Sequence, residues 1–416
     1  RLSYCYLREQ YCYLYPIALP AAVFRYYNNV LEEANCQIME AADMEENLKR
    51  AKQYHRQKDL LAIIKIQLTA AFLIFILLSG LSALLKDTVA SWSDDFYLQV
   101  SLYLAILAVI YYLLFAGLEF YNSFLLEHKF QLSNQTVLAW IKKSTKSVLI
   151  SLMMLWILGK ILYFFLRHFQ DWWWLPITAA LLLFTIMLGK ITPALIIPTF
   201  YKCSPLANSS LKERLLKLSK DCGVAAKDIF EIQLSKETKK ANALVAGFGK
   251  GRRIFLADTL LKGFSDDQIK AVFAHELGHI RLLHTWKIIG FGTAVSLVGF
   301  YITHLLLAKS INLFGFEHIY DIAAFPLLSL ILMAVGLVLL PMQNWHLRHL
   351  EKQADMFTIR HIQNRNSFAS AITKLSEQNL SDPSPGKFVE LFLYTHPPIA
   401  KRLRYMGEKN EKVEQN

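Results

Sequence analysis

The chain has 416 residues, of which 54% are hydrophobic and 19% are charged, and its mean hydropathy is +0.29. This composition is too apolar for an ordinary soluble protein and indicates a membrane protein with soluble parts. The net charge is +12, but the basic residues gather beside apolar runs like cytoplasmic anchors, so we expect no nucleic-acid partner.

Long apolar runs predict the membrane-spanning helices, because about 20 apolar residues cross about 30 Å of hydrocarbon. The N-terminal transmembrane region, residues 1–198, contains five such runs, and residues 286–342 contain two more. The first run is interrupted by Pro16 and Pro20, and a buried or interfacial segment is the alternative there. Residues 32–58 are heavily charged and predict a solvated helix. The predicted spans are 11–27, 66–85, 97–118, 147–166, 173–198, 286–307 and 323–342.

The region between the two groups of spans, residues 199–285, has the periodicity of a globular domain. An amphipathic helix is predicted at 211–222, short strands at 229–234, 243–245 and 253–257, and a further helix before 285. Residues 343–416 are polar and begin with a helix at 344–362. The predicted fold is therefore a mainly α integral membrane protein with about seven transmembrane helices and a small α+β domain.

The charges of the connecting loops predict an orientation. The loops at 119–146, 201–285 and 344–416 are rich in Lys and Arg, whereas the loops at 86–96 and 309–322 are not. Because cytoplasmic loops carry the excess of Lys and Arg, the α+β domain is predicted to face the cytoplasm in a multi-pass membrane protein.

One short motif in the globular region carries the chemistry. Residues 272–280 contain His275-Glu276-Leu-Gly-His279, an H-E-x-x-H pattern, and residues 265–268 precede it as a capping box that predicts a helix. Histidines four apart share one face of a helix and can bind one Zn²⁺, with Glu276 beside the water that the metal activates. The alternative is a surface helix with two unrelated histidines.

A catalytic zinc needs a third protein ligand and an open position. Glu351 is the best candidate, because Glu351 and Asp355 are four residues apart and share a helix face. One of them can bind zinc while the other accepts the N–H of a ligating imidazole. A solvated charged helix is the alternative, and His346 and His349 are rival ligands without a partner at helical spacing.

Other polar residues lie in or beside the spans. His284 follows His279 by five residues and is expected to point to a different face of the helix. His304 is expected to be packed or to line a cavity. Lys160 and Lys190 are expected to face an interior or a water-filled cavity, with snorkelling to the interface as the alternative.

Taken in order, these motifs make the chain resemble the type I CAAX prenyl protease family, membrane zinc metallopeptidases related to the heat-shock protease HtpX. The resemblance covers roughly residues 119–404. It departs at Leu244, where the family often has an aromatic residue, and at Leu347, where serine is common. The matching segments are 127–136, 198–206, 242–249, 254–261, H-E-x-x-H at 275–279, R-x-x-E-x-x-A-D at 348–355 and H-P-P-x-x-x-R at 396–402.

The resemblance implies seven helices around an intramembrane chamber, with the site at its cytosolic end. It implies a zinc endopeptidase, with one Zn²⁺ per chain held by His275, His279 and Glu351, and with Glu276 as general base. Asp355 would orient a ligating histidine. The implied substrate is a peptide or protein cut near the C-terminus of a CAAX-type sequence, prenylated or not.

Five further site residues follow from the resemblance. His396 and Arg402 are catalytic candidates as donors to the oxyanion, with a helix stop and a solvated arginine as the alternative. Asn242 and Ala243 are assigned to substrate binding, with the substrate added as an edge strand; Asn242 as a simple turn residue is the alternative. Arg348 is also assigned to substrate binding.

Two other functions stay open on the sequence. The same chemistry serves membrane protein quality control in HtpX-type proteases, and a non-enzymatic membrane protein with a structural zinc is an alternative of another class. Glu276 argues against the latter, since a structural site needs no base. We favour a bacterial inner membrane, and for a eukaryotic chain we expect the endoplasmic reticulum.

Overall fold

The computed structural model describes residues 21–224 and 229–413. The chain divides into two compact units, Arg1–Arg50 and Ala51–Asn416. The described residues of the first unit are helical and belong to the long helix α2 (Ala21–Leu78). The second unit contains the rest of α2 and all the elements discussed below.

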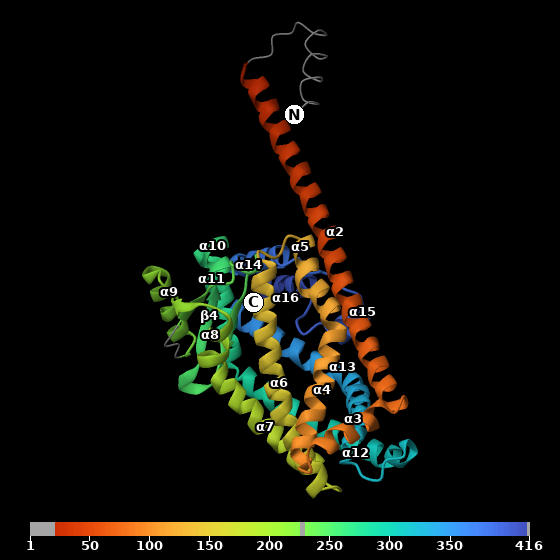
Figure 1. Ribbon diagram of the computed structural model, residues 1–416. Coiled ribbons are helices and arrows are strands. Elements are labelled where there is room, and N and C mark those ends of the chain that lie inside the picture. Colours follow the sequence, from red (N-terminus) through yellow and green to blue (C-terminus); the bar gives the residue numbers. More distant parts are fainter. Residues whose placement is uncertain (1–20, 225–228, 414–416) are drawn as a thin grey trace, which may run out of the picture. The chain divides into compact units, whose positions relative to one another are not determined.

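Most of the second unit is helical (Figure 1). Within the described residues, six helical segments are long and apolar enough to cross a membrane: Met44–Leu78, Phe96–Lys129, Val137–His168, Trp174–Phe200, His284–Phe314 and Ile322–His361. The predicted fold class is confirmed, and six of the seven predicted spans coincide with or overlap these segments. The expected span at 11–27 lies outside the described residues, except for its end, which is part of α2.

Several of these segments combine more than one helical element. The apolar elements after α2 are α4 (Phe96–Phe120), the π-helical turn η1 (Tyr121–Leu125), α5 (Leu126–Lys129), α6 (Val137–His168), α7 (Trp174–Ile191), the π-helical turn η2 (Thr192–Ile196), α8 (Ile197–Phe200), α12 (His284–Ser310), the 3₁₀ turns η4 (Ile311–Phe314) and η5 (Ile322–Ala324), and α13 (Phe325–His361). Helix α3 (Leu81–Trp92) connects α2 to α4, and α14 (Arg365–Gln378), α15 (Lys387–Leu393) and α16 (Ile399–Val413) follow α13.

The apolar run predicted as one span at 66–85 is divided between two helices. Gly80 has a φ of 77°, a left-handed conformation that costs little without a Cβ atom, so α2 ends at Leu78 and α3 begins at Leu81. Ser82 at the start of α3 donates a hydrogen bond of 2.6 Å to the carbonyl of Ala323. The break therefore turns the chain into contact with η5, the turn directly before α13.

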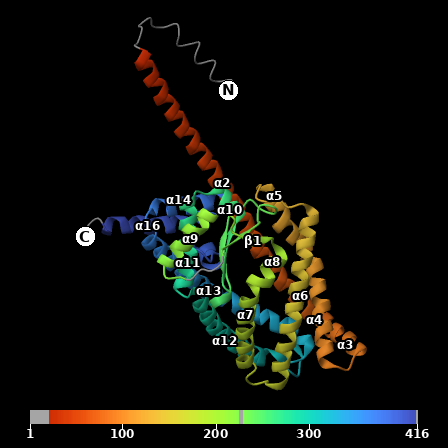
Figure 2. The ribbon, with the colours of Figure 1, turned by 90° about the vertical axis from the view of Figure 1, so that its left-hand side faces the viewer.

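The apolar helices pack in pairs, and four of them line a cavity. Helix α4 lies against α6, and α12 lies against both α7 and α13, as Figure 2 shows for α7 and α12. A cavity of about 590 Å³ is lined by residues of α2, α4, α6 and α13. Neither Lys160 nor Lys190 lines it: Lys160 stacks on Trp156 at 4.6 Å, and Lys190 is exposed. His304 packs edge-on against Trp173.

A small four-stranded sheet lies next to α9 (Ser209–Asp221), α10 (Asp258–Gly263) and α11 (Asp266–Arg281) in both views. The strands are β1 (Cys203–Pro205), β2 (Ile229–Ile232), β3 (Ala243–Ala246) and β4 (Arg253–Ala257), with the turn η3 (Gly249–Gly251) before β4. Their order is β1-β2-β4-β3, with β2 and β4 parallel. The central strand β4 is buried from residue 254 onward, whereas β3 pairs with β4 alone among the described strands and forms an edge of the sheet.

Helix α11 carries the H-E-x-x-H motif and is fixed at both its start and its side. The predicted capping box is confirmed: the Ser265 hydroxyl accepts from the Gln268 N–H, and the Gln268 side chain accepts from the Ser265 N–H. A Cβ atom on Gly278 would lie 3.2 Å from the Cα of Ala354. The absent side chain lets α11 approach α13 closely, which brings the motif beside Glu351.

Candidate metal centre and active site

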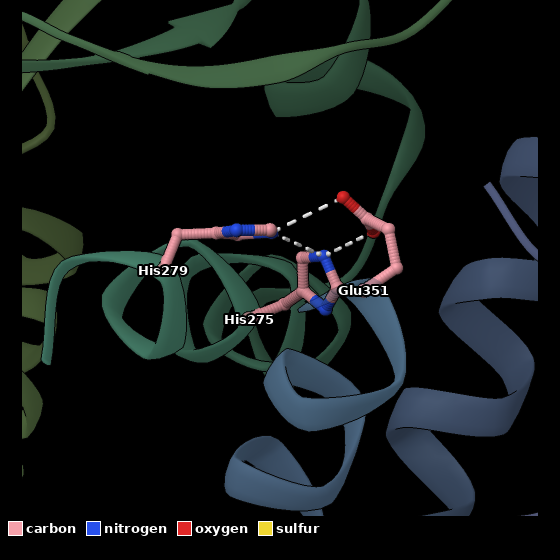
Figure 3. Close-up of side chains that lie close together, drawn as sticks. All are labelled: His275, His279 and Glu351. Carbon is pink, nitrogen blue, oxygen red and sulfur yellow. Dashed lines mark hydrogen bonds and ion pairs between the residues drawn. The ribbon is translucent and has the colours of Figure 1, made fainter. Parts of the chain in front are cut away.

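Three side chains of two helices converge on one point (Figure 3). His275 and His279 project from α11, and Glu351 projects from α13. The two Nε2 atoms are 3.2 Å apart, and the Glu351 oxygens lie 3.3 Å from His275 Nε2 and 3.5 Å from His279 Nε2. A tetrahedral metal with bonds of about 2.0–2.1 Å places its ligand atoms about 3.3 Å apart. The spacing therefore fits a zinc-sized ion.

The polar atoms of this group also fit a cation. Glu351 is 8% exposed, and its Oε2 atom makes no hydrogen bond among the described residues. A buried carboxylate oxygen without a donor is costly unless a cation compensates it. Among the described residues, no other group of three His, Cys, Asp or Glu side chains has its potential ligand atoms within 4.8 Å of one another.

The electrostatic surroundings differ for the two histidines. Burial lowers the pKa of His275, but the carboxylates of Asp355 and Glu351 outweigh burial and raise it to about 10. A position that favours a proton so strongly also favours a metal cation. Burial and the neighbouring charge of His275 lower the pKa of His279 to about 3, which keeps this imidazole neutral, as a metal ligand must be.

Asp355 fixes the ring of His275 from behind. Its Oδ1 atom lies 3.0 Å from His275 Nδ1, and its side chain is fully buried. Arg402 on α16 donates from Nε and Nη2 to the two Asp355 oxygens at 2.8 and 2.6 Å. This bidentate pair holds the carboxylate so that His275 directs Nε2 toward Glu351.

Glu276 lies beside this group on the wall of a cleft of about 470 Å³. Burial raises the pKa of Glu276 to about 7, although His275 opposes the shift. A carboxylate whose pKa is close to neutral is suited to accept and return a proton. The position and the pKa both fit the predicted general base.

The same cleft gathers most of the other predicted residues. Asn242 and Ala243 line it at the start of β3, and Arg402 lines it beside His275. His396 also lines the cleft; its side chain is 64% exposed, and its Nε2 atom lies 3.4 Å from Glu351.

Arg348 does not line the cleft. Its Nη1 atom donates to the carbonyls of Glu390 and Tyr394 at 2.8 and 2.7 Å. These bonds hold the segment that leads to His396, so Arg348 acts on protein backbone in this structure.

His284 was expected to point to a different face of the helix that carries His279, and this expectation is wrong because the two residues lie on different helices. Helix α11 ends at Arg281, and Leu283 has a left-handed φ of 56° before α12 begins at His284. The five-residue spacing therefore does not belong to one helix. His284 Nδ1 lies 3.0 Å from His279 Nδ1, and its Nε2 atom lies 3.2 Å from the oxygen of Gln353.

The rival histidines have other partners. His346 stacks on Phe291 with ring centroids 4.1 Å apart, and His349 contacts Gln353 at 3.0 Å. Neither belongs to the convergent group of three ligands.

Further cleft residues carry no recognisable signal in the sequence. His55 and Asp59 reach the cleft from α2, and Tyr394 contacts His55 at 3.3 Å. Asn379 after α14 hydrogen-bonds both the N–H and the carbonyl of Ala241, directly before the predicted substrate residues. These residues are far from the motif in the sequence, and only the fold brings them to the cleft.

Comparisons with known proteins agree with this geometry. Peptidase family M48 matches residues 205–409, and the family described as CAAX prenyl protease N-terminal, five membrane helices, matches residues 28–202. The CAAX prenyl protease 1 of Saccharomyces cerevisiae is 31% identical over 321 residues, which cover 71% of this chain and 69% of the yeast protein. An uncharacterized metalloprotease of Bacillus subtilis, YhfN, is 28% identical over 87% of this chain and 85% of its own.

The solved structures contain a similar fold. The crystal structure of S. mikatae Ste24p matches with a TM-score of 0.76 and 26% identity, over 87% of this chain and 89% of that one. The two family models together match the N-terminal membrane helices and the peptidase part of the chain, in that order. The chain belongs to the CAAX prenyl protease group of Peptidase family M48 and is a multi-pass membrane metallopeptidase.

Proposed function

We propose that the chain is a zinc endopeptidase that binds one Zn²⁺ through His275, His279 and Glu351. The observation that carries this proposal is the convergence of three ligand atoms at tetrahedral spacing, one of which belongs to a buried carboxylate whose Oε2 atom makes no hydrogen bond among the described residues. When bound, the zinc polarises the scissile carbonyl and lowers the pKa of water.

The surrounding residues supply proton transfer and orientation. Glu276 takes a proton from the attacking water and returns it to the leaving amine. Asp355, held by Arg402, keeps the proton of His275 on Nδ1 and leaves Nε2 free for the metal. His396 is the better placed of the two oxyanion donors, because Arg402 already donates to both oxygens of Asp355.

The substrate binds along the edge of β3. Within the described part of the chain this strand pairs with β4 alone, and the residues at its start, Asn242 and Ala243, line the cleft that contains Glu276. An extended peptide that pairs with this edge would pass the metal group with its backbone. Arg348 contributes indirectly, by holding the segment before His396.

The substrate class is a CAAX-type C-terminal segment, prenylated or not. The relatives named CAAX prenyl protease 1 support this class. The cleft faces the cytoplasm, as the Lys-rich and Arg-rich loops indicate.

The test compares the wild type with Glu276→Gln in detergent. Bound zinc is measured, together with cleavage of a quenched CAAX peptide with and without a farnesyl group. We expect about one zinc per chain in both proteins and a loss of kcat of about 10²–10⁴-fold in the variant. Absence of zinc from the wild type would exclude the ligand assignment, and equal cleavage of unrelated unfolded proteins would favour quality control.

A further inference from the structure

We propose that His284 is a positioning residue that fixes the metal-facing tautomer of His279 through a chain of hydrogen bonds. This inference rests on the proposed binding of zinc by His279. The chain of bonds, here called the neutral relay, consists of His279, His284, Gln353 and His349. Its three contacts measure 3.0, 3.2 and 3.0 Å in that order.

The side-chain amide of Gln353 determines which atoms of the neutral relay donate protons and which accept them. Lys287, which can only donate, lies 3.5 Å from Gln353 Oε1, and the amide nitrogen of Gln353 faces His349. An amide oxygen only accepts, so His284 must carry its proton on Nε2, which faces this oxygen. A neutral imidazole has one N–H, and Nδ1 of His284 is therefore an acceptor.

The accepting atom, Nδ1 of His284, faces His279, the second proposed zinc ligand. His284 Nδ1 lies 3.0 Å from His279 Nδ1, so His279 must donate its proton there. Nε2 of His279 then holds a lone pair, and this atom faces Glu351 at 3.5 Å. The hydrogen bond made by the outer nitrogen selects which nitrogen can bind metal.

The two ligating histidines are thus held by different chemistry. Asp355 holds His275 with a charged carboxylate, whereas neutral groups hold His279.

His284 is also built into the structure as a buried polar residue. It is 1% exposed and is the first residue of α12, directly after the left-handed Leu283. Both ring nitrogens have partners. If packing alone explained His284, a phenyl ring would replace it without any effect on the metal.

The first experiment measures zinc dissociation constants of the full chain in detergent by competition with a chromogenic chelator. His284→Phe keeps the ring but removes the acceptor, and we expect zinc affinity to fall about 10–100-fold. His284→Asn places an oxygen near the position of Nδ1, and we expect it to restore most of the affinity. His346→Phe is the matched control, because His346 stacks on Phe291 without touching the ligands, and its affinity should equal that of the wild type.

A second pair of variants tests the relay from its other end. Gln353→Glu keeps an acceptor for His284, whereas Gln353→Leu removes it, so only the leucine variant should weaken zinc binding. This pair decides the matter if His284→Phe fails to give a monodisperse protein with a normal melting temperature. Wild-type zinc affinity in both His284→Phe and Gln353→Leu would overturn the neutral relay. Absence of zinc from the wild type would instead overturn the proposed function.

Discussion

Asp355 is a fully buried carboxylate whose only charged partners are His275 and Arg402 among the described residues. Asp355→Asn would leave the guanidinium of Arg402 buried without a counter-charge. We expect a loss of about 3–5 kcal/mol in stability and about 10–100-fold weaker zinc binding, measured by thermal unfolding and chelator competition.

A double variant separates these two effects. Asp355→Asn with Arg402→Met removes the unpaired charge, so it should recover part of the stability but none of the zinc affinity. Recovery of zinc binding in the double variant would contradict a role for Asp355 in holding His275.

The residues of the site were predictable where one regular helix sets their spacing. His275 and His279 share a face of α11, and Glu351 and Asp355 share a face of α13, because each pair is four residues apart. His284 was assigned wrongly because the left-handed Leu283 interrupts the helix, and nothing in its residue type announces this conformation.

At the scale of elements, the contact between α11 and α13 depends on Gly278. A Cβ atom there would lie 3.2 Å from Ala354 Cα and 3.3 Å from its carbonyl oxygen, so the two helices would have to separate by a few tenths of an ångström. We expect Gly278→Ala to weaken zinc binding and to lower the melting temperature. Gly290→Ala in α12 is the control: it meets nothing within 4 Å and should bind zinc normally. Equal zinc affinity in both variants would contradict the close contact.

Asp258 joins the start of α10 to the turn after β2. Its carboxylate accepts from the N–H groups of Leu234 and Ser235 at 2.9 Å and from the Ser235 hydroxyl. Burial alone would raise the pKa of Asp258, but these bonds and Lys262 lower it below its usual value. The ionised form therefore stabilises the fold above the unfolded pKa of about 3.9, and this contribution disappears as the pH falls through the folded pKa.

The corresponding variant is Asp258→Asn. We expect it to cost about 1–3 kcal/mol at pH 7, with the difference from the wild type shrinking as the pH falls below about 4. Melting temperatures from pH 3 to 8 check this trend. A difference that stayed constant over this range would show that the charge of Asp258 is irrelevant.

A half-buried ionic group connects the membrane helices to the segment before β3. Glu127 on α5 accepts from Tyr54 at 2.6 Å and pairs with Lys58 and Lys240 at 2.7 and 2.8 Å. Lys240 lies two residues before Asn242. We expect Glu127→Gln to raise KM for a peptide substrate with little change in zinc content, because two lysines would repel each other without their shared carboxylate. A kcat loss with unchanged KM would contradict this connection.

The elements themselves were only partly predictable. Apolar length located most membrane helices, and alternation located β2, β3 and β4. The three-residue strand β1 escaped because it is too short for a pattern, and the end of α2 escaped because the run of apolar residues continues through Gly80. The ionic group at Glu127 joins residues up to 186 positions apart, such as Lys240 and Tyr54, which no local pattern reveals.

For the whole molecule, the proposed orientation places the loop at 86–96 opposite the peptidase part. In a cysteine-free background, we expect a membrane-impermeant maleimide to label Asp94→Cys from the outside of intact cells. Lys387→Cys should be labelled only after the membrane is opened. Both positions are exposed, so access to reagent and not burial decides the result. If Lys387→Cys were labelled in intact cells and Asp94→Cys only after the membrane is opened, the orientation would be the reverse of the proposed one.

None of the described strands covers the outer edge of β3. An edge that recognises backbone groups offers little to a folded domain, whose own amides and carbonyls are already satisfied. Abundant globular proteins in the same compartment would then be poor competitors, however well their sequences matched. The protease would select unfolded terminal segments. Cross-linking the C-terminal segment of a good substrate to its folded domain should therefore protect the substrate as effectively as mutating the bond that is cut.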